Sequence, residues 1–150
     1  MLAYLQENSR PKMSMVLHQT ACFSNNTLFA HEKAIKRMGR YLCHTKKEGI
    51  VYNPYTSKGL ECYADIDLSG GWSHDVAEDA DNVMSRTGMI IMYANCPIYW
   101  RSLLHNNISL STAEDEYISL SSALREVLPL MTMMEEIHEV FPLHIYKPIF

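Results

Sequence analysis

The sequence predicts an α/β fold, in which helical segments flank a mixed α+β sheet. Two changes of period carry this prediction. Apolar residues recur every three or four positions in residues 31–44 and again from residue 110, whereas they alternate with polar residues between residues 59 and 102. With 150 residues, 47% of them hydrophobic, and only 6 Gly and 6 Pro, the chain has the size and composition of one ordinary domain with a helical appendage.

Two helices are expected ahead of the sheet. Pro11 suits a first helical turn, and apolar residues four apart follow it, which predicts a short amphipathic helix ending near Ser24. A second helix is expected over residues 31–44, with its apolar side formed by Ala34, Ile35, Met38, Tyr41 and Leu42.

Four short segments with a period of two are expected to form the strands. Residues 49–55 predict a first strand, and a turn leads from them to Gly59. Residues 87–95 and 97–102 predict two strands joined by a short turn at Asn95, Cys96 and Pro97. Residues 59–68 predict the remaining strand. Its pleat sends alternate residues to opposite faces, with Leu60, Cys62, Ala64, Ile66 and Leu68 on one face and Glu61, Tyr63, Asp65 and Asp67 on the other.

A long helix is expected after the strands. Ser111 and Glu114 have the spacing of a capping box, and Pro129 is expected to kink or end the helix. A second amphipathic helical segment is expected to continue to Pro142. Residues 142–150 predict the start of another strand. The buried face of the long helix is expected at Tyr117, Leu120, Leu124 and Val127.

Composition disfavours several classes of protein. The sequence contains no run of about 18 apolar residues, so no membrane span is expected, and residues 1–12 lack the apolar stretch of a signal peptide. An intracellular location is therefore expected, either cytoplasmic or nuclear. No CxxC pair occurs, which disfavours a zinc ribbon or disulfide framework and predicts mostly buried, reduced thiols at Cys22, Cys43, Cys62 and Cys96.

Charge is unevenly distributed behind the net value of −4. Six of the 13 basic residues lie between Lys33 and Lys47, and seven of the 17 acids lie between Glu61 and Asp81. Such segregation is informative about partners. One side of the helix 31–44 carries a basic stripe that suits the phosphates of a nucleic acid, although most such stripes are only solvated faces; it comprises Lys33, Lys36, Arg37 and Arg40.

Three carboxylates are candidates for a catalytic site. Asp65 and Asp67 share one face of a strand, and Glu116 lies at the margin of the expected buried face of the following helix, whereas Glu114 and Asp115 are expected to point outward. Oxygen ligands from a strand and an overlying helix suit Mg²⁺, which in pairs activates water for phosphodiester hydrolysis. The alternative is that both aspartates lie on a solvated face and that Glu116 only favours the helix dipole. A glycosidase-like acid/base pair has no aromatic sugar platform to support it.

Five ordered sequence blocks, carried by four segments, point to a family. The segments "HEKAIKRMGRYLCHTKKEGIVY", "GLECYADIDLSGGW", "SRTGMIIMYANCPIYWRS" and "LSTAEDEYISLSSALREV" resemble, in order, the ribonuclease H region of Ty1/copia-type retrotransposon Pol polyproteins. The corresponding family patterns run roughly H-x-x-A-x-K-R-x-x-R-Y-L, Y-x-D-A-D-W-A-G, S-x-S-G, P-I-x-W-x-S and L-S-(S/T)-A-E-A-E-Y-I-A-L. The residues upstream are similar to the segment that joins the reverse transcriptase to that region.

The resemblance implies a ribonuclease H-like fold, C-terminally truncated, with residues 1–48 as a helical connecting segment and residues 49–150 as an incomplete domain. It implies metal-dependent cleavage of the RNA strand of an RNA–DNA hybrid, with the reverse transcriptase portion of the polyprotein as a partner. Asp65 matches the catalytic aspartate of the first strand, and Glu116 matches the helix glutamate. Both would bind Mg²⁺ or Mn²⁺, and Asp67 would support them.

The chain also departs from the family pattern. Residues 140–150 contain no Asp or Glu to match the family's third acid, so weak metal binding is expected. Lys12 stands in place of a usual Asp, and "SLLHNNIS" replaces a Ser-Lys-Lys/Leu-Gln stretch. The alternative interpretation is therefore a catalytically inactive remnant that at most binds nucleic acid through the basic helix 31–44. An unrelated structural domain is disfavoured by the order of the blocks.

Overall fold

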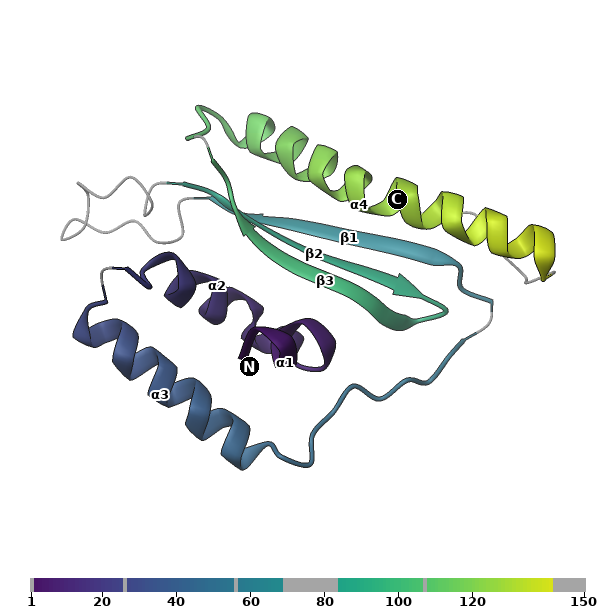
Figure 1. The fold of residues 1–150 in the computed structure, drawn as a ribbon. Helices are drawn as coiled ribbons and strands as arrows, with labels where there is room; N and C mark the ends of the chain where they lie inside the picture. The colour runs from purple at the N-terminus through teal and green to yellow at the C-terminus, as the bar shows by residue number, and fades with distance from the viewer. Residues whose placement is uncertain (1, 26, 56, 69–83, 107, 142–150) are drawn as a thin grey trace. The chain divides into compact units, whose positions relative to one another are not determined.

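The structure is a computed structural model of the chain that describes residues 2–25, 27–55, 57–68, 84–106 and 108–141 (Figure 1). The chain forms two compact units, Met1–Val51 and Tyr52–Phe150. The sequence predicted a boundary after residue 48, three residues earlier. The predicted α/β class is confirmed, since four α-helices and one antiparallel sheet are present among these residues.

The first unit is helical. It contains α1 (Leu2–Asn8), a 3₁₀ turn (Pro11–Met13), α2 (Ser14–Cys22) and α3 (Phe29–His44). The helices after Pro11 and over 31–44 were predicted, whereas α1 was not. Arg10 Nη2 donates to the backbone oxygen of Thr45 at 2.6 Å, and so satisfies a carbonyl just past the end of α3.

Helix α3 begins two residues earlier than the sequence predicted. Leu28 takes the N-cap position, and its backbone N–H donates to Nδ1 of His31 at 3.0 Å. The His31 imidazole therefore accepts the bond that the side chain of a Glu or Gln at this position accepts in a capping box. Met38 is the buried residue of this helix, at 5% exposure. Ile35 was expected on the buried face but is 44% exposed.

The sheet of the second unit has three antiparallel strands in the order β1-β2-β3. They are β1 (Leu60–Asp67), β2 (Arg86–Tyr93) and β3 (Cys96–Leu104). The β2–β3 turn consists of Ala94 and Asn95, whose φ angles of 49° and 65° are the positive values that a tight two-residue hairpin requires. The turn was predicted at Asn95–Pro97, but Cys96 and Pro97 already belong to β3.

The predicted strand over residues 49–55 is not formed. Val51, Tyr52 and Tyr55 are 85%, 57% and 60% exposed, so this segment has no face to bury, and Pro54 lacks the N–H that a ladder needs. Among the described residues, the N–H of Tyr55 donates to the oxygen of Ala94 in the β2–β3 turn at 2.8 Å, not to a strand. The predictions for residues 69–83 and for residues 142–150 lie outside the described residues.

One long helix, α4 (Thr112–Val140), lies along one face of the sheet (Figure 1). It was expected to kink or end at Pro129, but this proline lies inside the helix. Packing explains the difference, because Val127 on one side of the proline and Leu130 and Met131 on the other all pack in the same core. Burial of these residues offsets the backbone hydrogen bond that Pro129 cannot make.

The buried face of α4 also differs from the predicted one. Asp115, Ser119, Ala123 and Val127 are buried at a spacing of four. The predictions for Tyr117 and Leu120 were wrong: these side chains are 74% and 50% exposed. The row that faces the sheet therefore begins with a carboxylate and two small residues, and the bulkier Tyr117 and Leu120 lie outside it.

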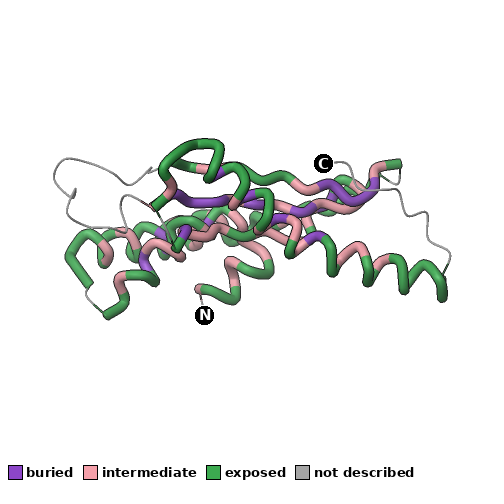
Figure 2. Tube along the Cα trace, turned by 90° about the horizontal axis from the view of Figure 1, so that it is seen from above, coloured by how far each residue is buried: buried purple, intermediate pink, exposed green. Residues whose placement is uncertain are grey.

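The core lies between α4 and the sheet, where Figure 2 shows buried residues following the strands. Leu60, Ile91 and Val127 form its centre, and all are at most 2% exposed. The prediction that Cys62 and Leu60 share the apolar face of β1 is confirmed, because both contact this cluster. No helix among the described residues is both long and apolar enough to cross a membrane.

Ile91→Ala is expected to lower the free energy of unfolding by about 3 kcal/mol, because Ile91 is fully buried and its removal leaves a cavity. Urea unfolding followed by circular dichroism measures this change. Ile98→Ala on β3 is the matched control, since Ile98 is 45% exposed. Equal losses in the two variants would show that the core is not centred on Ile91.

Candidate functional site

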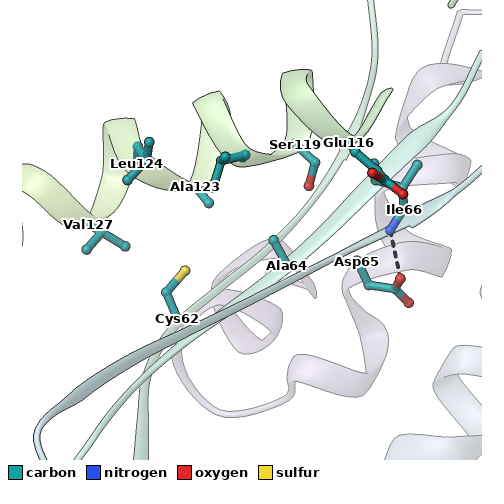
Figure 3. A pocket seen from close by; sticks show the side chains of 10 residues that line it. Cys62, Ala64, Asp65, Ile66, Glu116, Ser119, Ala123, Leu124 and Val127 are labelled. Carbon is teal, nitrogen blue, oxygen red and sulfur yellow. Dashed lines mark hydrogen bonds between the residues drawn. The ribbon is translucent and has the colours of Figure 1, made fainter. Parts of the chain in front are cut away.

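A groove of about 500 Å³ lies between β1 and the first half of α4 (Figure 3). Because β1 is an edge strand among the described strands, the groove borders a free sheet edge. Its walls are mostly apolar, with two carboxyl residues at one end. The lining residues are Cys62, Ala64, Asp65 and Ile66 from β1, and Glu116, Ser119, Leu120, Ala123, Leu124 and Val127 from α4.

Asp65 lines the groove, but its carboxylate does not point into it. Figure 3 shows Cys62 and Ala64 on the α4 side of β1 and the Asp65 carboxylate on the other side. There Oδ1 of Asp65 accepts the backbone N–H of Ile66 at 2.9 Å. Asp67 has the same parity as Asp65 and is also exposed. The predicted pairing of strand positions is thus observed, and it turns Asp65 away from the helix.

Glu116 lies on the α4 side of β1. It projects from the second turn of the helix beside Ile66 and is exposed (Figure 3). Asp65 and Glu116 therefore come from adjacent elements at one end of the groove, but with their carboxylates on different sides of the strand. The structure brings the two residues near the same strand end without directing their oxygen atoms at one point.

The fit of these residues to Mg²⁺ is poor as they stand. A protein-bound Mg²⁺ requires near-octahedral oxygen ligands at about 2.1 Å, usually including one or two carboxylates that face it together. Within the described part of the chain, no group of three or more His, Cys, Asp or Glu residues is placed to hold a metal ion. The assignment of Asp65 and Glu116 as metal ligands stays a prediction, and we derive no catalytic step from it.

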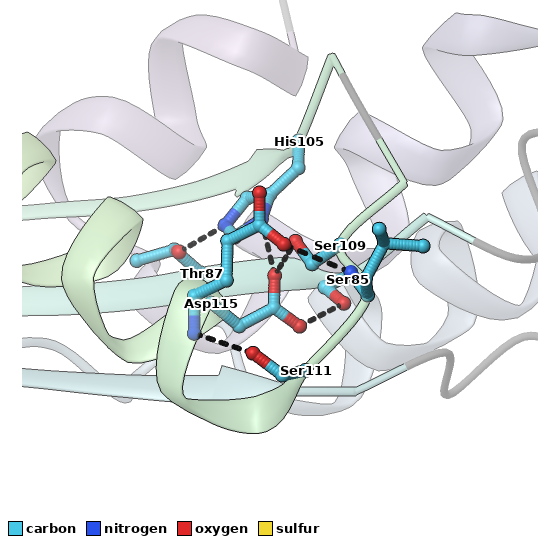
Figure 4. Close-up of polar contacts among 8 residues, drawn as sticks. Ser85, Thr87, His105, Ser109, Ser111 and Asp115 are labelled. Carbon is cyan, nitrogen blue, oxygen red and sulfur yellow. Dashed lines mark hydrogen bonds and ion pairs between the residues drawn. The ribbon is translucent and has the colours of Figure 1, made fainter.

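A buried polar network that the sequence did not predict lies at the start of α4 (Figure 4). Asp115, which was expected to point outward, is fully buried. Its Oδ2 accepts the hydroxyl of Ser85 at 2.5 Å, and its Oδ1 accepts the hydroxyl of Ser109 and lies 3.1 Å from Nδ1 of His105. Nε2 of His105 is 2.6 Å from Oγ1 of Thr87. The network joins the beginning of β2 and the end of β3 to the first turns of α4.

Hydrogen bonding keeps Asp115 charged inside the protein. Burial alone raises the pKa of its carboxyl group, but the hydroxyl donors of Ser109 and Ser85, together with His105, lower the pKa below its usual value. All hydrogen-bonding groups of the network are satisfied when Nδ1–H of His105 donates to Asp115 and the Thr87 hydroxyl donates to Nε2. The carboxylate thereby gains three donors in place of water, which is the condition for burying it.

The chain Asp115–His105–Thr87 has the order of a hydrolase triad, but it does not serve as one. Thr87 is 1% exposed, so no substrate reaches its hydroxyl. The network is structural. The spacing of four from Asp115 to Ser119 and Ala123 was a signal for it, because that row continues to the buried Val127.

The basic stripe is on the surface of α3. Lys33, Lys36, Arg37 and Arg40 are all exposed. Lys36 Nζ lies 2.5 Å from Oε1 of Glu32, but both side chains are more than half exposed, so this ion pair is weak. The other three cations have no ion-pair partner within 4 Å among the salt bridges of the described residues.

The prediction of mostly buried thiols was wrong in part, since Cys22 and Cys43 are exposed.

The fold and the site define a class of protein: an α/β unit in which one long helix covers a three-stranded antiparallel sheet, preceded by a basic helical unit. No protein-family model matches the chain, and no solved structure matches it.

The chain is similar to segments of retrotransposon Pol polyproteins and to one secreted effector protein. The retrovirus-related Pol polyprotein from transposon TNT 1-94 of Nicotiana tabacum is 28% identical over 136 residues, which are 91% of this chain and 10% of that protein. That from transposon RE1 of Arabidopsis thaliana is 27% identical over 129 residues, or 86% of this chain and 8% of that protein. The secreted RxLR effector protein 161 of Plasmopara viticola is 28% identical over 127 residues, 85% of this chain and 84% of that protein.

The chain spans no more than a tenth of the length of the TNT 1-94 and RE1 polyproteins. The comparisons support the resemblance to Ty1/copia-type Pol proteins, and they place the similarity in one segment of them.

Asp115→Asn is expected to lower the free energy of unfolding by roughly 3 kcal/mol at pH 7, because it removes a buried charge from its donors. The pKa of Asp115 is lowered by folding, so its contribution is present above the pKa of the unfolded chain, about 3.9, and is lost as the pH falls through the folded value. Urea unfolding at pH 7 and pH 3 should show a smaller difference between variant and wild type at pH 3.

Glu116→Gln is the control for this experiment. Glu116 is the exposed neighbour of Asp115, so its replacement is expected to change stability by at most about 0.5 kcal/mol. An Asp115→Asn protein as stable as the control would contradict the structural role of the network.

Proposed function

We propose that the chain is the ribonuclease H region of a Ty1/copia-type retrotransposon Pol polyprotein, together with the helical segment that follows the reverse transcriptase. In this proposal it binds nucleic acid through the basic face of α3 and does not itself cleave an RNA–DNA hybrid. Its partners are the hybrid and the reverse transcriptase portion of the same polyprotein, inside the cell. The observation that carries the proposal is the contrast between an exposed basic stripe and two carboxylates that do not converge.

Charge segregation supports nucleic-acid binding by the first unit. That unit contains 8 of the 13 Lys and Arg residues but only 3 of the 17 acids, for a net charge of +5. The second unit has 5 basic and 14 acidic residues, a net charge of −9, and the two values give the −4 of the whole chain. Phosphates are attracted by the first unit and repelled by the second.

The positions of Asp65 and Glu116 support the absence of cleavage. Phosphodiester hydrolysis by a metal pair needs carboxylates that bridge or flank both ions at a separation of about 4 Å. Asp65 points away from α4, where Glu116 lies, and its Oδ1 already accepts the N–H of Ile66. Mg²⁺ or Mn²⁺ would therefore meet one carboxylate at a time and bind weakly.

Replacement of Lys33, Lys36, Arg37 and Arg40 by Gln is expected to weaken binding to a labelled nucleic acid, measured by fluorescence anisotropy at several salt concentrations. Removal of four phosphate contacts should reduce the slope of log K against log salt by about 3. A matched comparison sets Lys33→Gln/Arg37→Gln against Lys46→Gln/Lys47→Gln, which removes the same charge from the same unit. Equal effects of the two pairs would show that net charge alone, and not the α3 face, binds nucleic acid.

Cleavage is tested separately. An RNA–DNA hybrid incubated with the protein and Mg²⁺ or Mn²⁺ is expected to stay intact on a denaturing gel. Robust cleavage that is lost in both Asp65→Asn and Glu116→Gln would overturn this part of the proposal, because the two carboxylates would then have to meet around one site in solution.

A further inference from the structure

An aromatic ring lies in line with the basic stripe of α3. Phe29 is the first residue of the helix and is 79% exposed, more than any other Phe or Trp whose side chain is described. Residues 29, 33, 36, 37 and 40 differ by 4, 7, 8 and 11 positions, and at 100° per residue they fall within about 100° of arc. The ring therefore shares a face with all four cations, and the buried Met38 lies on the opposite face of the helix.

The exposure of Phe29 has no structural explanation within the first unit. The ring contributes nothing to the core, which in this unit involves Met13 and Met38. The neighbouring aromatic residue Phe23 is used internally, since its ring stacks on His31 with centroids 4.4 Å apart. An exposed phenyl ring costs hydration free energy, and on a strongly basic face it has the composition of a base-stacking platform.

The dimensions of the face suit a short stretch of one strand. From Phe29 to Arg40 the helix rises about 16 Å at 1.5 Å per residue, which is long enough for its cations to reach several successive phosphates of one strand. A duplex keeps its bases stacked and paired, so it offers α3 only phosphates. A single strand offers phosphates to the cations and an unstacked base to Phe29.

We infer that the face of α3 formed by Phe29, Lys33, Lys36, Arg37 and Arg40 binds single-stranded nucleic acid, with one base stacked on the Phe29 ring. This inference rests on the proposed nucleic-acid binding and adds the class of ligand to it. Affinity for a single strand should exceed affinity for a hybrid duplex of the same length, and Phe29 should account for the difference.

The experiment measures anisotropy of labelled eight-residue oligothymidylate and of an eight-base-pair RNA–DNA hybrid at low salt. Phe29→Ala is expected to weaken binding of the single strand by about five-fold or more, the effect of losing one stacked base, and to leave binding of the hybrid unchanged. Phe29→Trp should restore single-strand affinity, and the fluorescence of the new indole should be quenched when the oligonucleotide binds.

Leu28→Ala is the matched control. Leu28 is also apolar and 61% exposed, but it precedes the first turn of α3 as an extended N-cap residue, and its capping bond uses only its backbone. It should leave both affinities unchanged. Circular dichroism should be the same for all variants, because neither side chain is buried.

The outcomes separate this inference from the proposed function. If Phe29→Ala leaves single-strand affinity unchanged while the four-Gln variant loses it, the stacking inference is wrong and the proposed binding stands. If neither variant loses affinity, both are wrong. Equal losses of single-strand affinity in Phe29→Ala and Leu28→Ala would show that both side chains act through general apolar contact, such as the docking of a protein. That result would also overturn base stacking.

Discussion

The alternation of β1 is the constraint on which the candidate site depends. Leu60 and Cys62 face α4 because they pack against Val127 and Ile91, and the pleat then fixes every other side chain of the strand. Asp65 lies an odd number of positions from Leu60 and Cys62, so its carboxylate is on the face of the strand that is turned away from α4. Turning it toward α4 would require a slip of one residue in the register with β2, which would expose Leu60 and Cys62.

The start of α4 is held by a second constraint, the network around Asp115. Its three donors come from the residue before β2, from the residue after β3 and from the loop ahead of the helix. Because Asp115 is anchored in the core, the adjacent Glu116 is held at the surface of the groove.

Local patterns predicted most elements, because each depends on nearby residues. The period of two in β1, β2 and β3, the helical period of α3, and Ser111 as N-cap of α4 all appear as expected, the last through its hydroxyl accepting the N–H of Glu114 at 3.2 Å. The errors arose where packing outweighs pattern. Pro129 does not end α4, since core contacts continue on both sides of it, and residues 49–55 have no face to bury.

The geometry of the site is harder to derive from the sequence than the fold is. Alternation placed Asp65 on the face opposite Leu60 and Cys62, and an amphipathic helix covers the apolar face of a sheet, so the sequence already opposed a meeting of Asp65 and Glu116 on the α4 side. The choice of Tyr117 over Asp115 as a buried residue had a different cause. Hydrophobicity favours tyrosine, and only the contacts of Ser85, His105 and Ser109 make burial of a carboxylate favourable.

The orientation of β1 beneath α4 is tested most directly by nuclear Overhauser contacts in the isotopically labelled protein in solution. The account predicts cross-peaks from the side-chain protons of Cys62, Ala64 and Ile66 to residues of α4 such as Ala123, and none from the β-protons of Asp65 to that helix. Cross-peaks between Asp65 and Glu116, without any from Ala64 to α4, would contradict this orientation. The two carboxylates would then face each other and could bind one metal ion.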